Sequence, residues 1–166
     1  MTAYLENRVE IFRNKWGRAH VTNFILLAAI AWIPAQIIHW VVPLIYSGPP
    51  MSDFYFKRPL NAIAATLIIA PYLETHGMRL IFFILGKFIH RQTVVNLVSS
   101  LIWGAIHGST ESWGLYAIWP FYVLGVCLLR LRSSSPTRAF WITAALHSTL
   151  NGLSYIVYLA GERPAN

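Results

Sequence analysis

Apolar stretches that approach the length of a membrane span account for most of this 166-residue chain. A helix of about 20 apolar residues crosses the roughly 30 Å of hydrocarbon in a bilayer. We therefore expect an all-α, polytopic membrane bundle of about five helices. The expected helices cover residues 22–45, 60–86, 93–108, 113–130 and 139–160.

Composition excludes the main soluble classes. Of all residues 56% are hydrophobic and 11% are charged, whereas a soluble domain usually carries about 25% charged residues. The net charge of +7 suggests polyanion binding, but the basic residues are scattered between apolar runs, so we expect no nucleic-acid partner. The single cysteine, Cys127, excludes a disulfide framework and a cysteine-based zinc site.

The distribution of basic residues predicts the orientation of the bundle, because cytoplasmic loops carry an excess of Lys and Arg. Nine basic residues lie on one side of the expected membrane and three on the other, and Arg79 lies inside the second helix. A cytoplasmic N-terminus follows from this asymmetry. The nine are Arg8, Arg13, Lys15, Arg18, Lys87, Arg91, Arg130, Arg132 and Arg138, and the three are Lys57, Arg58 and Arg163.

The chain divides into two expected parts. Residues 1–59 contain a basic N-terminal segment, an uncleaved anchor helix and a loop that opens at residues 47–50, and residues 60–160 form the core. The second helix, at 27 residues, would be about 40 Å long. It must therefore tilt or break, and Pro71 and Gly77 mark where it could bend.

Ionisable groups at membrane depth are costly and indicate a functional site. Glu74 is the only acid inside an expected helix. Glu74 and Arg79 are five residues apart, so they do not share a helix face, and Glu74 should face partners on other helices. His76 flanks Glu74 but should point elsewhere, and His39 beside Trp40 is expected at the membrane interface.

Two histidines complete the set of candidates. His107 follows Trp103 by four residues, and His147 and Asn151 are also four apart, so the members of each pair share a helix face. Gly104 and Gly108 would let a neighbouring helix approach closely. One Glu and two His on three helices could activate a water as a general base, with Asn donating to an oxyanion, or could hold zinc with an open position for water. Both chemistries hydrolyse an amide, and the spacing does not choose between them.

These motifs, in this order, resemble those of the CPBP family of intramembrane proteases, which includes type II CAAX prenyl endopeptidases and bacteriocin-processing proteins. The family carries Glu-Glu-x-x-x-Arg, then Phe-x-x-x-His, then His-x-x-x-Asn or His-x-x-x-Asp on separate helices. Residues 74–79, 103–107 and 147–151 look like these three motifs. The resemblance extends over about residues 60–156.

The resemblance implies an intramembrane endopeptidase with four catalytic residues. Glu74 would be the general base, His107 and His147 would orient water or stabilise the transition state, and Asn151 would complete the oxyanion site. We favour a glutamate-type mechanism without cofactor. If the enzyme used zinc, Glu74, His107 and His147 would hold the ion.

Two positions depart from the family motifs. Thr75 replaces the second Glu, so Arg79 lacks a carboxylate one turn earlier and would need another counter-ion, such as Glu111 or a lipid headgroup. Trp103 replaces the Phe, which changes volume more than chemistry. We expect Thr75, Arg79 and Trp103 to support the site.

The expected partners are the lipid bilayer and a substrate with an apolar or lipidated tail, or a tail-anchored protein, at the plasma membrane of a bacterium or archaeon. Two other functions stay open. One is a non-catalytic immunity or regulatory protein that binds a hydrophobic peptide. The other is a proton-coupled transporter, which five helices without an inverted repeat disfavour.

Overall fold

The chain folds entirely into helices and turns wherever this computed structural model describes it, so the expected all-α class is confirmed. The described backbone covers residues 2–45, 63–108 and 111–161, with most side chains of 22–44, 63–108 and 114–160. The predicted domain boundary near residue 59 and the loop at 47–50 lie outside these ranges. The elements are α1 (Thr2–Ile45), the π-helical segment η1 (Ala65–Ile69), α4 (Ala70–Leu85), α5 (Gln92–His107), α6 (Glu111–Arg132) and α7 (Pro136–Gly161).

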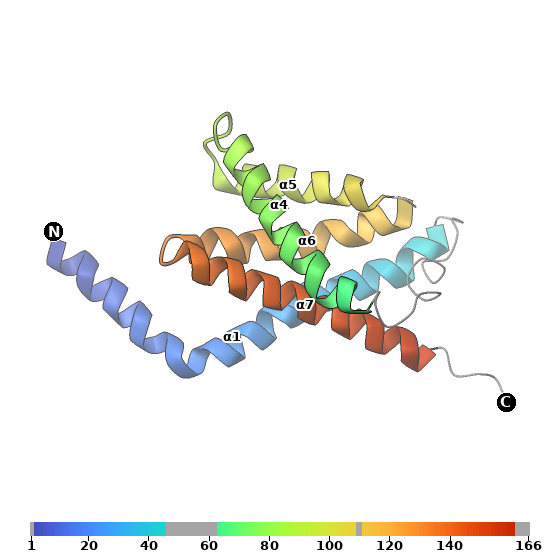
Figure 1. Ribbon diagram of the computed structural model, residues 1–166, viewed down its shortest axis with the longest axis horizontal. Coiled ribbons are helices and arrows are strands. Elements are labelled where there is room, and N and C mark those ends of the chain that lie inside the picture. Colours follow the sequence, from blue (N-terminus) through green and yellow to red (C-terminus); the bar gives the residue numbers. More distant parts are fainter. Residues whose placement is uncertain (1, 46–62, 109–110, 162–166) are drawn as a thin grey trace.

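Helix α6 is the centre of the bundle, because it packs against α1, α5 and α7. Helix α4 contacts both α5 and α7 and crosses the bundle obliquely (Figure 1). The first part of α1 projects away from the other helices. Helix α1 begins 20 residues before the apolar stretch from which it was predicted. Charged residues with high helical propensity extend the helix beyond its apolar part.

By length and composition, three described helices qualify as membrane spans: Thr22–Val42 of α1, Ala65–Leu85, and Gly114–Arg132 of α6. The other two expected spans, in α5 and α7, do not meet these criteria within the described residues, each for its own reason. Helix α5 has 16 residues, and the middle of α7 carries the polar side chains of the expected site. The membrane bundle is confirmed, but these criteria support three of the five predicted spans within the described residues.

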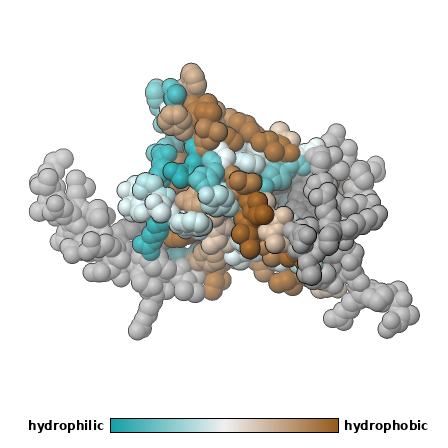
Figure 2. All heavy atoms as spheres, viewed as in Figure 1, coloured by the Kyte–Doolittle hydropathy of each residue, from teal (hydrophilic) through white to brown (hydrophobic). Residues whose placement is uncertain are grey.

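Large apolar side chains are exposed on α1, α4 and α5, as expected for surfaces that face lipid. Hydrophilic residues gather instead at one end of the molecule, where the turns α4–α5 and α6–α7 lie (Figure 2). Exposed Lys87, Arg91, Arg132 and Arg138 lie in or beside these turns. The N-terminus of α1 lies toward the same end. The three basic segments assigned to the cytoplasm thus share one end of the bundle, and the orientation itself stays a prediction.

The second apolar stretch begins with a π-helical segment that continues directly into α4. Residues of η1 form i→i+5 bonds, of which the bond from the Ala70 N–H to the Ala65 oxygen is the last. Pro71 then occupies the first turn of α4, where a residue without an N–H is tolerated. The change from π-helix to α-helix thus lies next to Pro71, the first position marked as a possible bend. Gly77, the second position marked as a possible bend, lies inside α4, which continues through that residue.

Glycines allow α5 and α6 to pack closely. A Cβ atom on Gly104 would lie 3.0 Å from the backbone oxygen of Gly114, and one on Gly114 would lie 3.3 Å from the α carbon of Gly108. Membrane helices pack through such small residues because lipid offers no hydrophobic drive for association. The expected close approach at Gly104 and Gly108 is confirmed, and it holds α5 in place against the central helix.

Candidate active site

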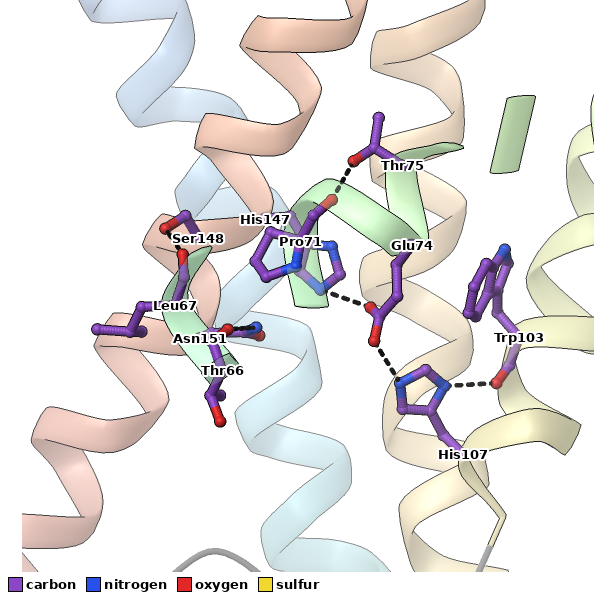
Figure 3. A network of polar contacts seen from close by, with 10 residues as sticks. All are labelled: Thr66, Leu67, Pro71, Glu74, Thr75, Trp103, His107, His147, Ser148 and Asn151. Carbon is purple, nitrogen blue, oxygen red and sulfur yellow. Dashed lines mark hydrogen bonds and ion pairs between the residues drawn. The ribbon is translucent and has the colours of Figure 1, made fainter. Parts of the chain in front are cut away.

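Side chains from α4, α5 and α7 meet around one carboxylate (Figure 3). Glu74 Oε1 lies 3.7 Å from Nε2 of His107, and Glu74 Oε2 lies 3.3 Å from Nε2 of His147. The Glu74 side chain is 21% exposed. It is the only acid whose side chain lies within the described residues. Glu74 therefore faces other helices, as its spacing from Arg79 predicted.

The ring of His107 is oriented by its own helix. Its Nδ1 lies 2.8 Å from the backbone oxygen of Trp103, and a carbonyl oxygen only accepts hydrogen bonds. We therefore assign the Nδ1 proton to this bond, which leaves the Nε2 lone pair of neutral His107 facing Glu74. The four-residue spacing of the second motif thus has a physical reason, because residue i supplies the carbonyl that residue i+4 requires.

His147 is the most buried member of the site, with 7% of its side chain exposed. Its Nε2 faces the Glu74 carboxylate, whereas its Nδ1 is buried and has no hydrogen-bond partner in the described part of the chain. Among the described residues, the acceptor that faces the ring is the Glu74 carboxylate, on the Nε2 side. We assign the proton of neutral His147 to Nε2, the nitrogen that faces the Glu74 carboxylate at 3.3 Å.

Phe121 of α6 packs against both histidines, a role that the sequence did not reveal. The centroid of its ring lies 5.0 Å from that of His107 and 5.2 Å from that of His147. The indole of Trp103 stacks on the same ring, with centroids 4.8 Å apart and planes at 4°. Phe121 lies within an apolar run, so its position beside the site carries no local sequence signal.

Gly77 leaves the space that the indole of Trp103 fills. A Cβ atom at Gly77 would lie 2.8 Å from the ζ2 carbon of Trp103 and 3.1 Å from its η2 carbon. The indole replaces the smaller Phe of the family motif, so the missing side chain at position 77 accommodates its extra volume. Gly77 and Trp103 therefore form a complementary pair between α4 and α5.

This complementarity predicts an effect on stability. Gly77→Ala should lower the free energy of unfolding by about 1–3 kcal/mol, the usual cost of overpacking, because stacking on Phe121 prevents the indole from moving. Adding Trp103→Phe should recover most of the loss. Thermal unfolding in detergent measures both. The control is Gly152→Ala, whose new Cβ would meet only the Leu67 δ2 carbon at 3.9 Å. Equal stability of Gly77→Ala and wild type would refute the pairing.

Asn151 lies one turn after His147 on α7, but its amide is directed to the π-helical start of the second apolar stretch. Its Nδ2 donates to the Thr66 oxygen at 2.9 Å. The neighbouring Ser148 hydroxyl donates to the Leu67 oxygen. The structure thus brings Glu74, His107 and His147 together and places Asn151 beside them, in contact with η1 (Figure 3).

The side chains of Thr75 and Arg79, which belong to the first motif, contact groups other than Glu74. Thr75 is fully buried and donates to the Pro71 oxygen at 2.7 Å. Arg79 is exposed, with its guanidinium carbon 5.8 Å from the centroid of the Phe140 ring. The predicted counter-ion Glu111 has no described side chain. His76 packs on Tyr72 and Phe140, so the prediction that it points away from Glu74 is confirmed.

The arrangement as it stands does not fit a zinc ion. Zinc requires its nitrogen and oxygen ligands about 2.0–2.2 Å from one point, which Glu74, His107 and His147 would have to meet together. Metal-binding histidines also anchor their second nitrogen, and Nδ1 of His147 has no such anchor in the described chain. No group of three His, Cys, Asp or Glu side chains within the described ranges has the geometry to hold a metal.

The described part of the chain is an all-helical membrane bundle, and its one described carboxylate lies between two histidines. These features define a membrane protein with a partly buried candidate site for acid–base chemistry. Residues 56–153, more than half of the chain, match the family described as type II CAAX prenyl endopeptidase Rce1-like. The chain belongs to this family, which confirms the resemblance to CPBP proteases. At the level of the family it is an intramembrane CAAX-type endopeptidase. No curated protein and no solved structure gave a match.

Proposed function

We propose that the protein cleaves a peptide bond with a water molecule activated by Glu74 and without a metal ion. The observation that supports this most strongly is the Glu74 carboxylate between Nε2 of His107 and Nε2 of His147. The contact of 3.7 Å to His107 is too long for a direct hydrogen bond. A polar separation of this length suits a bridging water.

The assigned tautomers explain how the water would be oriented. Glu74 Oε1 and the Nε2 lone pair of His107 are both acceptors, so a water between them donates one hydrogen to each. The lone pairs of the water oxygen then face the substrate. Glu74 takes one proton as the oxygen bonds to the scissile carbonyl carbon, and the carbonyl π electrons move to the carbonyl oxygen.

The charge on that oxygen needs hydrogen-bond donors. His147 Nε2–H supplies one, and the second N–H of the Asn151 amide supplies another, since the first donates to Thr66. When the tetrahedral intermediate collapses, the carbon–nitrogen bond breaks and protonated Glu74 gives its proton to the leaving amine. Water and one peptide bond are converted to a carboxyl group and an amine, and Glu74 is regenerated.

The substrate is expected to have an apolar or lipidated tail. The helices that supply Glu74 and His107 present apolar side chains outward beside them, with Leu73 59% and Ile106 60% exposed. A substrate segment that reaches Glu74 therefore passes exposed apolar side chains. We place the enzyme in the plasma membrane of a bacterium or archaeon, where a hydrophobic peptide or a protein with a C-terminal sorting tail is a suitable substrate.

The function is tested by comparing membrane proteomes of cells that carry the wild-type protein and cells that carry Glu74→Gln. Cleavage predicts at least one membrane-associated protein whose full-length form accumulates in the Glu74→Gln cells. Its new terminus should appear only with the wild type. Identical proteomes, together with wild-type protein that binds an apolar peptide without cutting it, would instead support the non-catalytic, peptide-binding function.

A further inference from the structure

Pro71 supplies no N–H at a point where two backbone carbonyls are possible acceptors for one. In an α-helix the N–H of residue 71 would bond to the oxygen of residue 67, and in a π-helix to that of residue 66. Proline has no N–H, and η1 ends at the bond from Ala70 to Ala65. The Leu67 oxygen therefore lacks its α-helical donor and the Thr66 oxygen lacks its π-helical donor. A donor from another helix stabilises such an oxygen, because an unpaired carbonyl at membrane depth costs several kcal/mol.

Helix α7 supplies those donors to the same two oxygens. Ser148 Oγ donates to Leu67 and Asn151 Nδ2 donates to Thr66 at 2.9 Å. The two side chains are three residues apart, so they project from one face of α7. Figure 3 shows both directed at η1, on the side of Glu74 away from His107. Two bonds to consecutive carbonyls fix both the distance and the register between α7 and η1.

Two proposed catalytic residues, His147 and Glu74, lie next to these contacts between α7 and η1. His147 immediately precedes Ser148 on α7, and Glu74 lies three residues after Pro71 on α4. Thr75 donates to the Pro71 oxygen and reinforces this first turn of α4. The bond from Ser148 to Leu67 therefore lies close in the chain to both members of the contact between His147 Nε2 and Glu74 Oε2, which are 3.3 Å apart.

We infer that Ser148 is a positioning residue: its hydroxyl replaces the N–H that Pro71 lacks and so holds His147 in register with Glu74. Asn151 contributes the second bond through one N–H of its amide. This inference rests on the proposed function for its catalytic consequence. We call the hydrogen bond from Ser148 to the Leu67 oxygen, four residues before Pro71, the clamp. This bond is independent of any substrate.

The clamp predicts that an N–H restored at position 71 compensates for the loss of the Ser148 hydroxyl. Ser148→Ala should lower kcat at least about tenfold with KM unchanged, since a displacement of about 1 Å at a catalytic group can cost about 100-fold. Pro71→Ala alone should stay close to wild type. The double variant Pro71→Ala with Ser148→Ala should recover kcat to within about threefold of wild type, because the backbone N–H that alanine restores at position 71 can bond to the Leu67 oxygen.

The experiment measures kcat and KM on an internally quenched farnesylated peptide, and thermal unfolding in detergent, for the full chain. Ser148→Thr, which keeps the hydroxyl, should retain activity. The control is Thr149→Ala, which removes a hydroxyl bonded only within α7, to the Ala145 oxygen, and should not change kcat. Wild-type kcat in Ser148→Ala, or no recovery in the double variant, would overturn the inference.

The unfolding data separate the clamp from the proposed function. If the wild-type protein fails to cleave the peptide, the clamp still predicts a lower unfolding midpoint for Ser148→Ala and a midpoint restored by Pro71→Ala. That result would support the clamp while the proposed activity fails. Independent, additive losses from the two substitutions would overturn the clamp, whatever the activity.

Discussion

Replacing Glu74 with glutamine should abolish peptide-bond cleavage and leave the helical bundle folded. Glutamine matches glutamate in shape but cannot take a proton from water, so the general base is lost while packing is kept. General-base catalysis contributes about 10²–10⁴-fold, and we expect a loss of kcat of at least about 10³-fold. Cleavage of an internally quenched farnesylated peptide measures it, with thermal unfolding and membrane insertion checked on the same preparation.

The matched control for this variant lies two residues away on the same helix. His76 is exposed and packs on Tyr72 and Phe140 instead of on Glu74. His76→Gln should therefore cleave the peptide at the wild-type rate. Cleavage by Glu74→Gln at a rate similar to that of His76→Gln would remove Glu74 from the mechanism.

Replacing His147 with leucine should be the next most damaging change. Leucine removes the Nε2–H donor that faces Glu74 Oε2 at 3.3 Å, and loss of one oxyanion donor costs about 10²–10³-fold in kcat. His147→Gln keeps an amide N–H near the same position and should lose only about tenfold, by the same donor argument. Steady-state kinetics on the farnesylated peptide separate the two variants.

Stability distinguishes a catalytic role for His147 from a structural one. Nδ1 of His147 is buried without a partner in the described chain, so leucine removes a polar group that packing does not need. The unfolding midpoint of His147→Leu should stay close to that of wild type while kcat falls. A variant that keeps more than about a third of wild-type kcat, or that loses activity only through unfolding, would contradict the assigned role.

Hydropathy predicted the helices well because lipid imposes their length. The ends of α5, α6 and α7 lie within three residues of the expected boundaries. The start of α1 was missed because its first 20 residues are helical without being apolar. Gly77 was marked only as a possible bend, and its contact with Trp103 was not predicted, since a glycine in a sequence does not reveal whether it admits a neighbouring side chain.

The contact of Glu74 with the two histidines could also be predicted from the sequence. A lone acid at membrane depth needs partners, and spacings of four placed His107 and His147 on defined faces. The direction of the Asn151 amide was not predictable, because it depends on a backbone carbonyl that is distant in the sequence. Phe121 was missed because only the packing of α6 between α5 and α7 brings an ordinary apolar residue against both histidines.

The most direct test of a metal-independent, Glu74-based protease is to measure metal content and cleavage in one purified sample. Wild-type protein and Glu74→Gln in detergent are treated with a chelator, analysed for zinc by mass spectrometry and assayed on the farnesylated peptide. We expect wild-type cleavage at full rate with far less than one zinc per chain, and none from Glu74→Gln. Stoichiometric zinc, with activity lost on its removal and restored on its return, would contradict the account.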